Sequence, residues 1–134
     1  MKTLTLKLLL AILISTTIAP NAMADMSKAG KEAMVAAGHI MFKHRCQSCH
    51  SNNLSKPSYG PTLKKVYGRK AGSIVGFNYS DALRKSGIVW NETTLRKWIS
   101  SNKEMMPGTR MRHVGVTDKA EQNFLIEYLK HISK

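Results

Sequence analysis

Residues 46–50 read Cys-Gln-Ser-Cys-His, and this short run contains both cysteines of the 134-residue chain. Two cysteines are too few for the disulfide framework of a small secreted scaffold, which usually needs four or more. The chain must therefore be stabilised by a packed core, and an apolar fraction of 43% suits one globular domain. The run also places two thiols and an imidazole close together in the sequence, and the fold must accommodate whatever these three groups bind.

The spacing of these residues favours covalent attachment of a haem. Two thiols three positions apart, Cys46 and Cys49, can add to the two vinyl groups on one haem edge and form thioether bonds. The imidazole of His50, directly after the second cysteine, then lies under the ring and reaches the iron as an axial ligand. The predicted cofactor is one covalent haem c.

Three other interpretations of the motif fit the chain less well. A thioredoxin-like Cys-x-x-Cys belongs to a strand-rich fold, whereas this motif follows a predicted helix and precedes loops. A zinc site needs two more ligands at regular spacing, and the other histidines are scattered. A small-loop disulfide would leave His50 without a role.

The N-terminus has the pattern of a secretory signal peptide. Lysines flank the start of an apolar run at residues 8–14, and Ala-Met-Ala at residues 22–24 supplies a small-x-small cleavage pattern. We expect cleavage after Ala24, which gives a signal peptide over residues 1–24 and a haem domain over residues 25–134 in the periplasm. The alternative, an uncleaved membrane anchor, is disfavoured because about 12 apolar residues are too few to span a bilayer.

The chain is strongly basic, with 21 Lys and Arg against 8 Asp and Glu and a net charge of +13, or +11 without the two signal lysines. This charge favours an acidic protein or an anionic membrane surface as partner. Nucleic acid is not expected, because the chain has no recognition motif and is exported. Five basic residues flank the predicted haem-binding segments: Arg45, Lys56, Lys103, Arg110 and Arg112. They predict a positive surface around the haem edge, the alternative being a merely solvated basic face.

A first helix is predicted from Ser27, as N-cap, to about Arg45, because apolar residues recur at helical spacing without proline. Gly38 in its middle costs about 1 kcal/mol relative to Ala, so we expect another element to pack closely there. Residues 51–78 are punctuated by glycine and proline and show no alternating strand pattern. A bound cofactor explains so long a loop, because it supplies apolar surface for the loop to cover.

Three more helices are predicted to follow. Their expected N-caps are polar residues: Ser80, Asn91, and Thr117 or Asp118. The first of these helices ends at Gly87, the second at about Ser101 and the last at about Ile132. Glu121 is the expected capping-box partner of Asp118.

A haem held by one histidine leaves the sixth iron position to be assigned. Three methionines are far enough along the chain to reach the opposite haem face: Met105, Met106 and Met111. All lie in or beside the Pro-Gly-Thr loop at residues 107–109, and spacing alone does not choose among them.

These motifs together resemble a class I c-type cytochrome, the family of mitochondrial cytochrome c and its small soluble bacterial relatives. The resemblance covers roughly residues 38–134, from Gly38 and Phe42 in the first helix to the apolar stripe of the last. It implies an all-α cytochrome c fold, in which the terminal helices cross and short helices and loops wrap around one covalently bound haem.

The resemblance also implies the remaining haem contacts. The Pro61 carbonyl accepts the proton of His50, and Met111 becomes the sixth iron ligand. Contacts with the haem propionates fall to Arg69, Tyr79, Trp90 and Thr109. Three residues depart from the family pattern: Leu83 in place of a common asparagine, Trp98 in place of a tyrosine, and His113 in place of a phenylalanine that shields the haem edge.

The expected function is transfer of single electrons between redox proteins of a bacterial electron-transport chain. Iron with one histidine and one thioether ligand is coordinatively saturated, which favours an electron carrier and not an enzyme. We expect the carrier to be a monomer. The expected partners are acidic redox proteins, such as a quinol–cytochrome c reductase and a terminal oxidase or reductase, with weak contact to an anionic membrane surface. The alternatives are a haem enzyme or gas- or peroxide-binding protein with a labile sixth ligand, and a haem-free thiol oxidoreductase.

Overall fold

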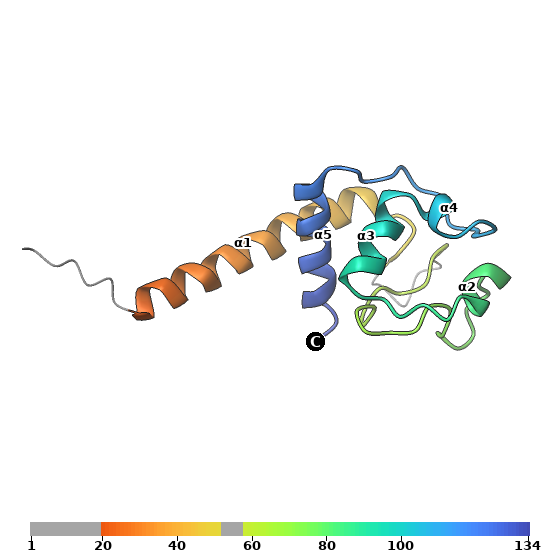
Figure 1. Ribbon diagram of the computed structural model, residues 1–134, viewed down its shortest axis with the longest axis horizontal. Helices are drawn as coiled ribbons and strands as arrows, with labels where there is room; N and C mark the ends of the chain where they lie inside the picture. The colour runs from red at the N-terminus through yellow and green to blue at the C-terminus, as the bar shows by residue number, and fades with distance from the viewer. Residues whose placement is uncertain (1–19, 52–57) are drawn as a thin grey trace, which may run out of the picture.

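The protein is described by a computed structural model over residues 20–51 and 58–134. Its helices are α1 (Pro20–Arg45), α2 (Asp81–Lys85), α3 (Glu92–Ser100), α4 (Asn102–Met105) and α5 (Lys119–His131) (Figure 1). Among the described residues the β structure is a single isolated bridge between Lys70 and Val89, so the all-α prediction is confirmed. None of the helices in these ranges combines the length and apolarity needed to cross a bilayer. Residues 1–19 of the predicted signal peptide, and Lys56, lie outside the described residues.

The two terminal helices cross, and α5 lies over the C-terminal half of α1 (Figure 1). Gly38 is the point of closest approach, because a Cβ atom there would fall 2.0 Å from the Phe124 carbonyl oxygen and 2.7 Å from the Tyr128 Cβ. Phe42, one turn further along α1, and Leu125 of α5 are fully buried beside the crossing. The close packing expected at this glycine is confirmed.

The prediction of Ser27 as the N-cap of the first helix is wrong. Helix α1 begins at Pro20, where the missing N–H and fixed φ of proline suit a first helical position. No glycine or proline lies between Pro20 and Gly30, so no helix-breaking residue makes the helix begin at Ser27. Residues 27–33 are exposed, and this part of α1 projects from the globule (Figure 1).

The caps of the short helices agree with the sequence analysis. Ser80 accepts the Leu83 N–H at 3.3 Å at the start of α2. Asn91 and Thr94 form a reciprocal capping box at the start of α3. Helix α4 was not predicted, since its four residues are too few to show a periodicity.

Asp118, rather than Thr117, caps α5 by accepting the Glu121 N–H at 2.8 Å. The Glu121 carboxylate, expected to complete a capping box, instead pairs with Arg45 at 3.1 Å. This ion pair connects the start of α5 to the end of α1, next to the Cys-x-x-Cys-His run.

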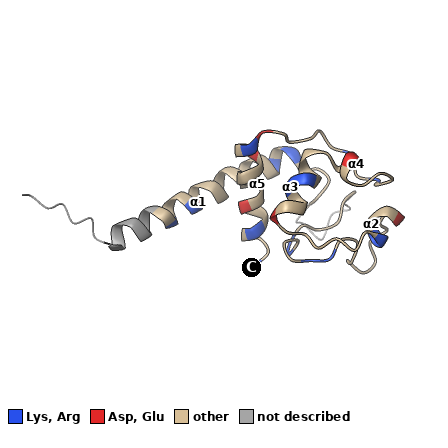
Figure 2. Cartoon of the chain, viewed as in Figure 1, with Lys and Arg blue, Asp and Glu red and all other residues tan. Residues whose placement is uncertain are grey.

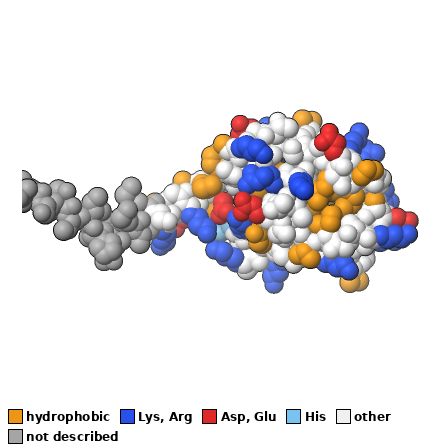
Figure 3. Space-filling view, viewed as in Figure 1, with side chains coloured by type: hydrophobic (Ala, Val, Ile, Leu, Met, Phe, Trp, Pro, Cys, Tyr) orange, Lys and Arg blue, Asp and Glu red, His pale blue; other side chains and the backbone are white. Residues whose placement is uncertain are grey.

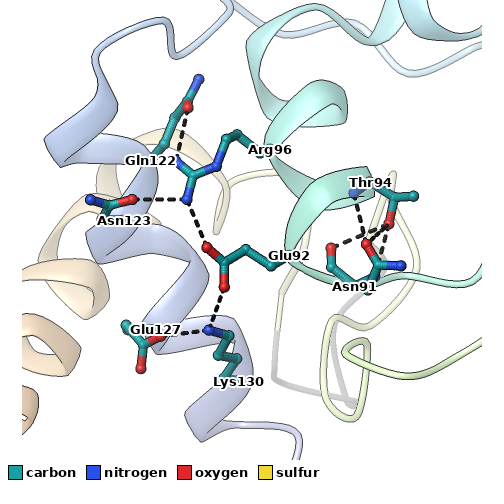
Figure 4. Close-up of polar contacts among 8 residues, drawn as sticks. All are labelled: Asn91, Glu92, Thr94, Arg96, Gln122, Asn123, Glu127 and Lys130. Atoms are coloured by element: carbon teal, nitrogen blue, oxygen red, sulfur yellow. Dashed lines mark hydrogen bonds and ion pairs between the residues drawn. The ribbon is translucent and has the colours of Figure 1, made fainter.

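A polar network joins α3 to α5 (Figure 4). The Glu92 carboxylate pairs with Arg96 at 3.0 Å within α3 and with Lys130 of α5 at 2.9 Å. Lys130 also pairs with Glu127 at 2.7 Å, and the Arg96 guanidinium donates to Gln122 at 3.2 Å. These contacts link α3 to α5.

Candidate functional site

A cavity of about 460 Å³ lies among the end of α1, the loop that follows it, α3, α5 and the segment between α4 and α5. It is lined by every residue that the sequence analysis assigned to the site: Cys46, Cys49, His50, Pro61, Arg69, Tyr79, Trp90, Thr109 and Met111. A volume of this order, with mostly apolar walls and a few polar groups, is typical of cofactor sites. A second hollow of about 910 Å³, between α1 and the end of α5, contains none of these residues.

His50 is held at the cavity wall with one ring nitrogen free. It is 6% exposed, and its Nδ1 lies 2.8 Å from the Pro61 carbonyl oxygen. A carbonyl only accepts, so Nδ1 carries the proton and Nε2 keeps a bare lone pair. Burial lowers the pKa of His50, against the opposing effect of the Pro61 hydrogen bond, and His113 adds to the lowering. The ring is thus in the neutral, oriented form that binds a metal.

Gly60 makes this position of the imidazole possible. A Cβ atom at residue 60 would fall 2.5 Å from the His50 Cε1, which is closer than Cβ atoms approach other atoms in folded proteins. The Gly60 N–H also donates to the Cys49 carbonyl at 2.7 Å, which folds the loop back onto the motif. The Gly-Pro pair therefore both admits the ring and supplies its hydrogen-bond acceptor.

Cys46 and Cys49 lie in the turn that continues α1, with the His50 N–H donating to the Cys46 carbonyl at 2.8 Å. Neither thiol is in a disulfide. Burial raises the pKa of the Cys46 thiol to about 11, although Arg45 partly opposes the rise. Burial thus opposes the lowered pKa that a redox-active nucleophile would need at Cys46. In the described part of the chain no cluster of three His, Cys, Asp or Glu could hold a metal ion.

Met111 enters the same cavity, whereas Met105 and Met106 do not line it. The Trp98 Nε1–H donates to the Met111 Sδ at 3.2 Å. The amide of Asn102, which is 3% exposed, donates to the Met111 carbonyl at 2.9 Å. Sequence reasoning missed Asn102, because nothing in the sequence distinguishes this residue from a surface asparagine.

Arg69 and Tyr79 form one polar part of the cavity wall. The Arg69 guanidinium donates to the carbonyl oxygens of Lys64 and Thr62, at 2.9 and 3.1 Å. Burial lowers the pKa of Arg69 and raises the pKa of Tyr79, and each residue partly offsets the shift of the other. A partly buried cation next to a phenol is a fitting surrounding for a carboxylate. The residues present therefore fit a haem, with thiols and imidazole on one side, a thioether on another, and a cation for the propionates.

The mouth of the cavity is apolar and basic. Tyr59 and Val114 line it and are 92% and 83% exposed. Arg45, Arg110 and Arg112 line it too, and no Asp or Glu among the described residues does. Figure 2 shows Lys and Arg positions along several helices and connecting segments of the globule, and Figure 3 shows apolar side chains gathered between α2 and α3.

An all-α fold with crossed terminal helices and a Cys-x-x-Cys-His segment in the wall of an apolar cavity defines a protein that carries covalent haem. The sequence model of the Cytochrome c family matches residues 35–133. The chain belongs to the cytochrome c family. It is a monohaem electron carrier with one covalently attached haem c, and not an enzyme.

Similar proteins come from several bacteria. Cytochrome c2 iso-2 of Magnetospirillum fulvum is 42% identical over 87 residues, which cover 65% of this chain and 91% of the relative. Cytochrome c2 of Blastochloris viridis is 37% identical over 121 residues, covering 90% of this chain and 87% of the relative. The solved structure of cytochrome cH from Methylobacterium extorquens superimposes with a TM-score of 0.66 at 42% identity, covering 72% of this chain and 97% of that one.

Proposed function

We propose that the chain is an exported electron carrier in which His50 and Met111 hold the haem iron from opposite faces. The observation that carries this proposal is the convergence of two restrained ligand side chains in one cavity. His50 presents a bare Nε2 because Pro61 takes its other nitrogen, and Met111 is held at its sulfur by Trp98. The bound haem supplies a one-electron Fe(II)/Fe(III) couple.

The residues of the chain set the potential of the haem and hold its propionates. The soft sulfur of Met111 favours the ferrous iron, and the apolar walls disfavour the extra charge of the ferric iron; both raise the potential. Four residues are proposed to hold the propionates: Arg69, Tyr79, Trp90 and Thr109. Two firm ligands leave no iron position for a substrate, which favours the carrier over a haem enzyme or a gas- or peroxide-binding protein.

The absorption spectrum of the purified holoprotein tests this ligand pair. We expect a low-spin ferric spectrum with the weak far-red band of a methionine–iron(III) bond. A high-spin ferric spectrum at neutral pH would refute the ligation by Met111. Haem that leaves the chain on acid–acetone extraction would refute the attachment to Cys46 and Cys49.

We also propose that the carrier acts in the periplasm as a monomer, after removal of residues 1–24. Its proposed partners are acidic redox proteins, such as a quinol–cytochrome c reductase and a terminal oxidase or reductase, with weak contact to an anionic membrane surface. The absence of acidic residues at the described part of the cavity mouth supports this choice, since a basic rim attracts an acidic one. Intact mass spectrometry of the periplasmic fraction tests the cleavage, and a full-length mass there would overturn it.

A further inference from the structure

His113 follows Met111 by two residues and lines the same cavity. Its Nε2 lies 3.0 Å from the Ile99 carbonyl oxygen. Its Nδ1 is buried and has no hydrogen-bond partner, and among the described residues it is the one buried side-chain nitrogen or oxygen in that situation. A buried polar atom without a partner is costly, so this nitrogen calls for an explanation.

The hydrogen bond to Ile99 fixes the state of the ring. A carbonyl oxygen only accepts, so Nε2 carries the proton and Nδ1 keeps a bare lone pair. His50 is in the same state, with one nitrogen donating to the Pro61 carbonyl and the other bare. A ring with one nitrogen donating to a backbone carbonyl and the other bare is the arrangement of metal-ligating histidines.

His113 lies in a segment without helix, residues 107–117, in which Thr109 and Val116 are buried on either side of it. The Val116 N–H donates to the Ile99 carbonyl at 2.8 Å, so that oxygen stays satisfied when the His113 ring leaves it. Exchange of Met111 for His113 needs a local movement of residues 111–114 between these buried positions, and it breaks the hydrogen bonds from Trp98 and Asn102 to Met111.

We propose that His113 is a reserve ligand of the haem iron, which takes the sixth position when the Met111 sulfur leaves it in the ferric state; this rests on the proposed ligation by Met111. The sulfur–iron bond breaks and a nitrogen–iron bond forms. The imidazole binds through a bare lone pair and keeps one ring proton, so no electron or proton is exchanged with solvent. Imidazole is a harder ligand than a thioether, and the exchange therefore favours Fe(III) over Fe(II).

A lysine is a weaker candidate for the same position. Lys103 of α4 is exposed and does not line the cavity. His113, by contrast, lines the cavity.

Ferric Met111→Ala holoprotein at pH 7, in a buffer without imidazole, tests the proposal by electron paramagnetic resonance and absorption. We expect a low-spin spectrum of two imidazole ligands in Met111→Ala and its loss to a high-spin spectrum in Met111→Ala/His113→Ala. The control is Met111→Ala/His131→Ala, which removes an exposed histidine outside the cavity and should stay low-spin.

A high-spin Met111→Ala protein overturns the proposal, as does a low-spin spectrum that persists without His113. If Met111→Ala does not retain its covalent haem, Met111→Leu, which keeps the apolar volume, is scored by the same criteria. The proposed function fails separately, because a high-spin ferric spectrum of the wild-type protein refutes Met111 ligation whatever the variants show.

Discussion

At the scale of single residues, Met111 is restrained at both of its ends. Trp98 donates to the sulfur at 3.2 Å, and Asn102 donates to the carbonyl oxygen at 2.9 Å. The first contact acts on the electron density of the proposed ligand, and the second on the position of the backbone that carries it. The two effects can therefore be separated by mutation.

Trp98→Phe should lower the midpoint potential. A donated hydrogen bond withdraws electron density from sulfur and weakens it as a ligand of Fe(III), so removal of the donor stabilises the ferric state. A bond of about 1 kcal/mol corresponds to a fall of about 40 mV. Redox titration of both proteins measures the change, while the far-red band checks that Met111 is still bound. An unchanged or higher potential would contradict the argument.

Asn102→Leu should make the sixth ligand easier to displace. Loss of a buried hydrogen bond worth about 1.4 kcal/mol should raise the rate of cyanide binding to the ferric protein about tenfold. Gln122→Leu is the matched control, because the Gln122 amide is equally buried and donates to the Val116 carbonyl at 2.7 Å. The control should lose stability without faster cyanide binding, and equal acceleration in both variants would count against a role of Asn102 at Met111.

The residues of the site differ in how far the sequence predicts them. The residue types and spacing at residues 46–50 predict haem attachment by themselves, whereas the roles of Pro61 and Met111 are predicted from the resemblance to a family. Asn102 could not be predicted, because its role depends on a backbone carbonyl nine residues further along. Contacts from a side chain to a distant backbone atom leave no pattern in the sequence, whereas a motif that binds a cofactor does.

At the scale of helices, the crossing of α1 and α5 depends on the absence of a side chain at Gly38. The structure places the Phe124 carbonyl where a Cβ atom would be. Caps such as Asn91 and Asp118 were predictable from sequence because they act over three residues. The start of α1 was not predictable in this way. A residue that can serve as N-cap, such as Ser27, does not mark the start of a helix when the residues before it also favour helix.

Gly38→Ala should destabilise the fold by at least about 1–3 kcal/mol, because the methyl group must push two helix backbones apart. Gly30→Ala in the same helix is the control, since nothing lies within 4 Å of a Cβ atom there. The control should gain up to about 1 kcal/mol from helix propensity. Denaturant unfolding of the holoproteins measures both, and similar changes in the two variants would argue against the close crossing.

Glu92→Gln tests the network between α3 and α5 and should show a pH dependence. Hydrogen bonds from Lys130 and Arg96 hold the pKa of Glu92 below its usual range. The stabilisation is therefore complete above the unfolded-state pKa of about 4.3 and disappears as the pH falls through the lowered value. Because the carboxylate is exposed, we expect a difference of at most about 1 kcal/mol at pH 7 between wild type and variant.

Unfolding of both proteins across the acid range measures this difference. Glu104→Gln, at an exposed carboxylate on α4 without an ion pair in the described part of the chain, should show a smaller effect. A wild-type advantage that is constant with pH would mean that the network contributes through packing and not through charge.

At the scale of the whole molecule, the charge is large but is not confined to one side (Figure 2). Several cations near the cavity are partly engaged within the chain, since Arg45 pairs with Glu121 and Arg112 donates to the Thr109 carbonyl at 2.7 Å. What distinguishes the cavity mouth is the lack of acidic residues among its described lining. Steering of an acidic partner should therefore depend on where a charge lies and not only on the net charge.

Two charge reversals separate these effects. Arg110→Glu changes an exposed cation at the cavity mouth, and Lys28→Glu changes one on the projecting part of α1. Both lower the net charge by the same amount. At low ionic strength, Arg110→Glu should slow electron transfer to an acidic partner roughly threefold to tenfold, and Lys28→Glu much less. The difference should vanish in high salt, because the Debye length is only about 3 Å at 1 M.

Stopped-flow kinetics across ionic strength measures both variants. Equal slowing would mean that the basic surface acts only through its total charge, and salt-independent rates would remove electrostatic steering altogether.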